Sequence, residues 1–78
     1  MVRISSPSGD VLRFIQSRGD RGATEEEIHE RFPLIIGLAP FYLSELRHFG
    51  YIRASGQRRT GRGPAVAWIA TGKARGER

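Results

Sequence analysis

The chain has no cysteine, so no disulfide and no thiolate metal site can form within its 78 residues. Long apolar runs are also missing, because the longest such stretch, residues 33–43, is too short and too interrupted to span a membrane. No N-terminal segment has the pattern of a signal peptide. We therefore expect one cytoplasmic domain, residues 1–78, without membrane contact and with too small a core for a roomy catalytic cleft.

Groups of residues that could form a catalytic or metal site are absent as well. His29 and His48 each lack a second histidine nearby, so we expect no metal site. Ser44 has no histidine that the sequence places beside it as a base. The acidic run at 25–27 is explained as the start of a helix, where carboxylates are favourable. The prediction is a protein that is not an enzyme and uses no cofactor.

Lysine is nearly absent too, since the chain has twelve arginines and one lysine. Residues 1–50 carry six arginines and seven carboxylates, a balance of −1. Residues 51–78 carry six arginines and the one lysine against a single carboxylate, a balance of +6, which gives the net charge of +5. Because guanidinium groups suit phosphates and base edges, this asymmetry indicates an acidic polymer as partner of the C-terminal part. A solubilising basic tail is the alternative.

Three segments have the periodicity of helices, at about residues 7–18, 24–32 and 40–49. The second has the clearest signal, because Thr24 followed by Glu27 matches a capping box, in which hydroxyl and carboxylate satisfy free backbone amides. The side chains expected to face inward are Val11, Leu12, Ile15, Ile28, Phe32, Leu43 and Leu46.

Two segments rich in β-branched and aromatic residues, 51–55 and 65–71, predict the strands of a β-hairpin. Between them lies a basic, glycine-rich loop of about eight residues, 56–63, which is longer than an ordinary hairpin loop and so favours a functional role. We expect Trp68 to be a core residue that fixes the hairpin to the helices, with a stacking platform as the alternative. Residues 72–78 are expected to form a flexible basic tail.

Three short motifs follow one another along the chain. "GATEEEI" would begin the second helix, "LSELRHFGYI" would end the third, and "RRTGRGPAVAW" would form the hairpin loop and its second strand. Together with the first helix they resemble a winged helix-turn-helix DNA-binding domain, in particular the small regulator-like ones of bacteria and phages. The resemblance covers about residues 7–71. It implies an α+β fold, in which three helices are followed by a β-hairpin wing.

The resemblance also implies that the third helix enters the major groove, while the wing reaches a neighbouring groove or the DNA backbone. Two features depart from the family pattern, namely the acid Glu45 on the third helix and the long connection at 33–39. The implied DNA contacts are Thr24 at the amide end of the second helix, Pro40, Phe41, Ser44, Arg47 and His48 on the third, and Arg53, Gln57, Arg58, Arg59, Thr60 and Arg62 in the hairpin.

We therefore predict a small protein that binds double-stranded DNA as a transcriptional, phage or mobile-element regulator. The alternative is a winged-helix module for protein–protein interaction or homodimerisation through residues 33–43, whose apolar side chains exceed what one short helix can bury. Single-stranded nucleic acid or RNA is a third option, disfavoured because exposed aromatic residues available for stacking are few.

Overall fold

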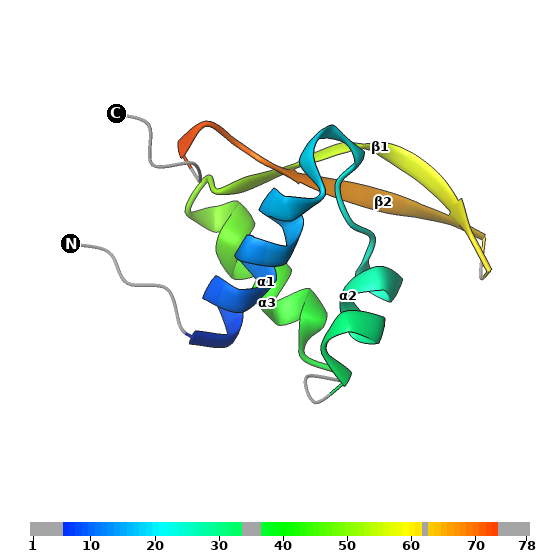
Figure 1. The fold of residues 1–78 in the computed structure, drawn as a ribbon, viewed down its shortest axis with the longest axis horizontal. Helices are drawn as coiled ribbons and strands as arrows, with labels where there is room; N and C mark the ends of the chain where they lie inside the picture. Colours follow the sequence, from blue (N-terminus) through cyan, green and yellow to red (C-terminus); the bar gives the residue numbers. More distant parts are fainter. Residues whose placement is uncertain (1–5, 34–36, 62, 74–78) are drawn as a thin grey trace.

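The computed structural model describes residues 6–33, 37–61 and 63–73 of the chain. Figure 1 shows helices packed along one side of a β-hairpin whose turn end extends past α2. The elements are α1 (Ser6–Ser17), the 3-10 helix η1 (Gly19–Arg21), α2 (Glu25–Arg31), α3 (Ala39–His48), β1 (Ile52–Thr60) and β2 (Gly63–Ala70). The α+β class is confirmed, as is the order of three helices followed by an antiparallel hairpin.

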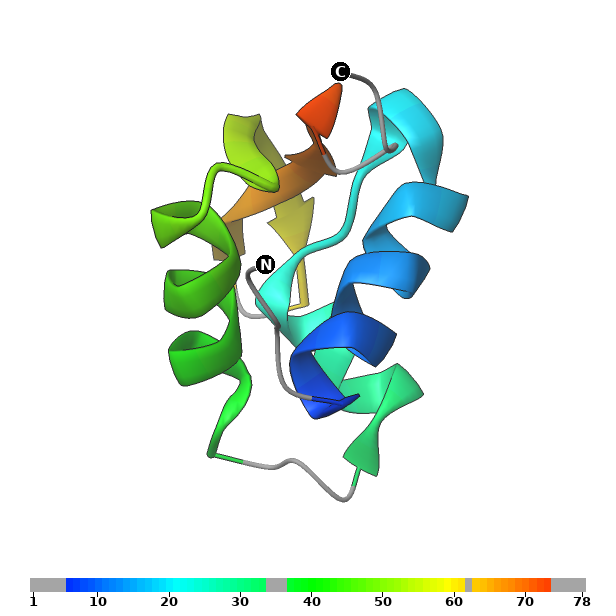
Figure 2. The ribbon, with the colours of Figure 1, turned by 90° about the vertical axis from the view of Figure 1, so that its left-hand side faces the viewer.

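The core lies where the helices meet the base of the hairpin. Figure 2 shows α1 and α3 on either side of the extended segment that leads from η1 to α2. The predicted inward-facing residues are confirmed, although Phe32 is only partly buried. Each large apolar side chain buried in this way contributes roughly 1.5–3 kcal/mol. The buried cluster comprises Val11, Leu12, Ile15, Ala23, Ile28, Ala39, Leu43, Leu46 and Ile52.

Local signals set the ends of the helices. The capping box of α2 is confirmed, since the Glu27 amide donates to Thr24 Oγ1 at 3.2 Å and the Thr24 amide donates to Glu27 Oε1 at 2.9 Å. Helix α3 ends in a Schellman motif, in which Gly50 adopts a φ of 81° and the Tyr51 amide donates to the Leu46 carbonyl at 2.9 Å. The predicted helix bounds were therefore correct to within about one residue.

The hairpin is longer, and its loop shorter, than the sequence predicted. The expected loop at 56–63 was wrong, because Gln57, Arg58, Arg59 and Thr60 all pair with residues of β2. The ladder satisfies backbone groups that a loop would leave to water. A bulge between Ala54 and Gln57, where Gly56 has a φ of 121°, lets β1 continue past the glycine.

Trp68 joins the hairpin to the helices, as predicted. Its amide donates to the Ala23 carbonyl at 2.8 Å, and the Ala23 amide donates to the Trp68 carbonyl at 2.9 Å. The indole is half-buried and packs against the helical core. The backbone at Ala23, just before α2, thus pairs with β2 and fixes the base of the hairpin to the start of that helix.

The predicted tail begins with a docked residue. The ammonium group of Lys73 donates a hydrogen bond to the Phe49 carbonyl at 2.9 Å, and it lies 5.3 Å from the centroid of the Tyr51 ring. A cation at this place is favourable, because the carbonyl end of α3 is partly negative. The rest of the expected tail, residues 74–78, lies outside the described residues. No helix in the described part of the chain is both long and apolar enough to cross a membrane.

Candidate nucleic-acid interface

The strand register divides the polar hairpin residues between two faces. Trp68 and Val66 lie on one face of β2, and the register places Gln57 opposite Val66 and Arg59 opposite Pro64. Gln57 and Arg59 therefore share the face of Trp68, and both are exposed. Arg58 pairs with Ala65 and lies on the other face. The extra residue at the bulge determines which of the two adjacent arginines lies on the Trp68 face.

Helix α3 presents polar side chains next to this face. Ser44, Arg47 and His48 are exposed, as the resemblance implied. Glu45 lies partly buried and accepts a hydrogen bond from Ser8 Oγ of α1. The acid that interrupted the family pattern is thus engaged with α1, so its charge is directed away from the exposed face of α3.

A groove connects α3 to the hairpin. It has a volume of about 220 Å³, and the Arg47 guanidinium lies 5.9 Å from the centroid of the Trp68 ring, within the range of a cation–π contact. The exposed carboxylate of Glu25 also lines it, which makes the groove itself unfavourable for a phosphate. The lining residues are Glu25, Pro40, Leu43, Ser44, Arg47 and Trp68.

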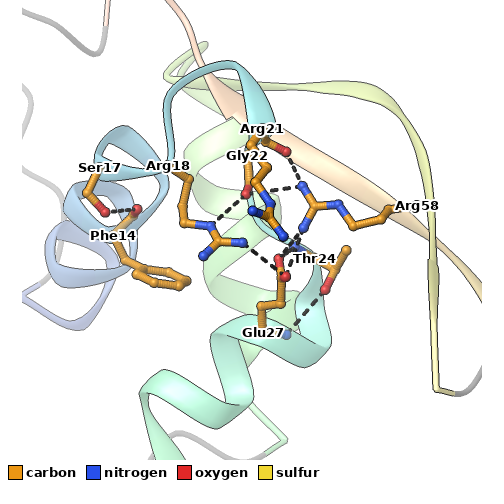
Figure 3. Close-up of polar contacts among 8 residues, drawn as sticks. All are labelled: Phe14, Ser17, Arg18, Arg21, Gly22, Thr24, Glu27 and Arg58. Atoms are coloured by element: carbon orange, nitrogen blue, oxygen red, sulfur yellow. Dashed lines mark hydrogen bonds and ion pairs between the residues drawn. The ribbon is translucent and has the colours of Figure 1, made fainter.

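On the opposite face of the hairpin, Arg58 belongs to an ion cluster centred on Glu27 (Figure 3). Its Nη1 lies 2.7 Å from Glu27 Oε1 and 2.8 Å from Oε2, while its Nη2 donates to the carbonyls of Arg21 and Gly22. From the end of α1, Arg18 donates Nη2 to Glu27 Oε2 at 3.1 Å and Nε to the Gly22 carbonyl at 3.0 Å. One carboxylate thus joins α1, α2 and the hairpin.

The charge of Glu27 is stabilised by its neighbours. Burial acts to raise the pKa of this carboxyl, but the Thr24 amide and the guanidinium groups of Arg18 and Arg58 outweigh it and hold the pKa below its ordinary value of 4.5. The group is therefore ionised at neutral pH. Its ion pairs contribute to stability there, and that contribution is lost only as the pH falls through the lowered pKa.

Two predicted contacts have structural roles in the fold. Thr24 is fully buried, and its hydroxyl and amide are both used by the capping box, so they are not presented to a ligand. Arg58 is held by Glu27 and by two carbonyls. The sequence indicated both residues as DNA contacts because helix amides and arginines attract phosphates. In the structure, Glu27 forms hydrogen bonds with both of them within the fold.

The remaining hairpin residues are spread over different surfaces. Arg53 pairs with Ile69 and lines a hollow of about 440 Å³ beside the end of α1, on the face opposite Arg59. The Thr60 hydroxyl donates to the Gly63 carbonyl at 2.7 Å, within the hairpin turn. Arg62 lies outside the described residues. Ser44 and Arg47 thus line the groove beside Trp68, and Gln57 and Arg59 lie on the same face of the hairpin as Trp68. Arg53, Arg58 and Thr60 lie on the other face of the hairpin.

Arg18 and Gly22 were not identified from the sequence, although both shape this region. Arg18 precedes Glu27 by nine positions, a spacing that indicates no contact within a helix. Gly22 has a φ of 69° and lies against the Trp68 carbonyl, a contact that no local motif indicates. Within the described residues, no group of three histidines and acids could hold a metal ion. Comparison with protein-family models, with curated proteins and with solved structures finds no match.

Proposed function

We propose that the chain is a winged helix-turn-helix domain that binds double-stranded DNA through one face, formed by α3 and the Trp68 face of the hairpin. The proposal depends on two observations about Trp68. Ser44 and Arg47 are exposed on α3 in the groove beside Trp68, and Gln57 and Arg59 are exposed on the same face of the hairpin as Trp68. Exposed guanidinium groups suit phosphates, and Arg47 and Ser44 can donate to base edges.

The arrangement of elements supports the same proposal. Helices α2 and α3 follow one another before the hairpin, and the hairpin is fixed to the segment ahead of α2 by the Ala23–Trp68 pairing. The side chain of Glu45 is turned to Ser8, which removes a repulsive charge from the exposed face of α3. The regulatory role expected from the sequence, for a bacterial, phage or mobile-element host, is part of this proposal.

Arg59→Ala tests the proposal. Because each neutralised phosphate releases counterions, wild-type affinity for a random duplex is expected to fall steeply with salt. Loss of one phosphate contact is expected to flatten the slope of log K against log salt by about 0.9. The measurement is a titration of labelled duplex at four salt concentrations.

Arg13→Ala is the matched control, since it removes the same charge from an exposed side chain of α1 that pairs with Asp10. Its slope is expected to equal that of the wild type. Binding that is indifferent to salt, or an Arg59→Ala slope identical to the Arg13→Ala slope, would contradict the proposal.

A second candidate function is favoured by two exposed apolar side chains at the start of α3. Leu38 is 48% exposed and Phe41 64% exposed. They belong to the stretch 33–43, of which residues 34–36 lie outside the described part. This surface would bind a second copy of the chain or another protein. For the homodimer, the apparent mass in sedimentation equilibrium should rise with concentration and return to the monomer mass in Phe41→Ser; a constant monomer mass in the wild type would exclude it.

A further inference from the structure

We propose that Glu27 is a positioning residue of the DNA-binding face. By holding Arg58 on one side of the hairpin, it determines where Arg59, on the other side, meets the DNA. This inference rests on the proposed function. It assigns the two adjacent arginines different roles, Arg58 as an anchor and Arg59 as a contact.

The anchor role follows from the hydrogen bonds that both terminal nitrogens of the Arg58 guanidinium make within the fold. Nη1 contacts both oxygens of Glu27, at 2.7 and 2.8 Å, and Nη2 donates to the carbonyls of Arg21 and Gly22. A guanidinium engaged by a carboxylate and two carbonyls would have to give up these bonds to bind a phosphate. Arg59 lies on the opposite face and is exposed, so it can bind a phosphate without breaking the cluster.

The position of Arg58 along the hairpin gives this anchor its effect. The pairing of Trp68 with Ala23 holds the hairpin near its base, whereas Arg58 lies beyond the bulge, toward the turn. Two attachments on either side of a bulge fix the direction of the outer half, which one attachment at the base leaves free to bend. The anchored half is the one that carries Gln57 and Arg59.

Glu27 is suited to this role because its carboxylate is itself fixed. It accepts from the Thr24 amide at 2.9 Å, which orients it at the start of α2, and from Arg18 at the end of α1. Arg18 and Arg58 approach it from opposite sides, as Figure 3 shows. Glu27 therefore fixes the hairpin to α1 and α2, and α3 packs against both of these helices.

The test compares Arg58→Ala with Arg59→Ala in the same duplex titration, at a temperature where circular dichroism shows each variant folded. For Arg58→Ala we expect affinity to fall about three- to tenfold, because an ordered hairpin becomes mobile. The slope of log K against log salt should stay at the wild-type value, since no phosphate contact is lost. Arg59→Ala should instead lower the slope by about 0.9.

Two further variants separate positioning from mere stability. Arg58→Lys, which keeps the charge opposite Glu27 but loses the fork, should recover part of the affinity. Glu27→Gln should weaken binding as Arg58→Ala does. The double variant should weaken binding by less than the sum of the two single variants, because both remove the Glu27–Arg58 ion pair. Amide NMR relaxation should show residues 57–60 more mobile in Arg58→Ala than in the wild type.

Several results would overturn the inference. A slope reduced by about 0.9 in Arg58→Ala would make Arg58 a phosphate contact. Tighter binding by Glu27→Gln would mean that the acid withholds Arg58 from DNA. Unchanged hairpin mobility in Arg58→Ala would show that the pair does not position the hairpin. Failure of the wild type to bind any duplex would overturn the proposed function instead, while the relaxation measurement would still decide whether Glu27 anchors the hairpin.

Discussion

Gly22→Ala is expected to destabilise the domain by about 3 kcal/mol or more, a large part of the roughly 4–12 kcal/mol that stabilises a chain of this length. A Cβ at this position would overlap the Trp68 carbonyl and lie 2.8 Å from Ile69 Cγ2. The φ of 69° adds backbone strain. The overlap would disrupt the backbone pairing of Ala23 with Trp68, which fixes the base of the hairpin. It would also displace the Gly22 carbonyl, which accepts a hydrogen bond from Arg18.

The measurement is thermal unfolding followed by circular dichroism, with an expected fall in Tm of more than about 12 °C. Gly19→Ala is the matched control, because Gly19 also has a positive φ, 59°, but a Cβ there meets no atom within 4 Å. It should cost only the backbone strain, about 1–2 kcal/mol. Equal losses at the two positions would show that the contact with Trp68 is not the cause.

Leu46→Ala is expected to lower the free energy of unfolding by about 2–5 kcal/mol. Leu46 is fully buried in the cluster formed by α1, α2 and α3, and truncation would leave a cavity that three packed helices cannot easily close. Since α3 also carries Ser44 and Arg47, a loosened α3 should weaken DNA binding as well. Urea denaturation would measure the change, with the midpoint lowered and the m-value kept.

Phe41→Ala provides the control on the same helix. Its side chain is 64% exposed, so the free energy of unfolding should change by no more than about 0.5 kcal/mol. If Leu46→Ala lowered the free energy of unfolding as little as Phe41→Ala, the result would contradict the burial of Leu46 between α3 and the core. If Phe41→Ala were as severe as Leu46→Ala, Phe41 would be buried against something that the described chain does not include, as in the second candidate function.

The helices could be predicted from the sequence because their signals lie within a few residues. Thr24 and Glu27 form their capping box within one turn of α2. The apolar residues Leu43 and Leu46 recur at helical spacing and are buried. Gly50 ends α3 through the left-handed conformation that its lack of a Cβ allows.

The candidate interface could be predicted only in part. Arg47 and Ser44 followed from the face of the third helix, but the roles of Arg58 and Arg59 could not be separated, because adjacent residues on a strand point to opposite sides. Which side each one takes depends on the bulge at Gly56 and on the pairing with β2, both non-local features. The glycine-rich composition favoured a loop, and the cross-strand pairing outweighed it.

Composition and short-range pattern, which need no knowledge of distant contacts, determined the three helices, the capping box of α2, the presence of a hairpin and the excess of positive charge in the last 28 residues, 51–78. Only the tertiary structure decided which charges remain available, because that depends on groups that meet across long separations in the chain. Glu27 and Arg58 are 31 residues apart, and Ser8 and Glu45 are 37 apart. These contacts engage one arginine and two acids inside the fold, and leave Arg59 and Arg47 exposed on the face where we propose that DNA binds.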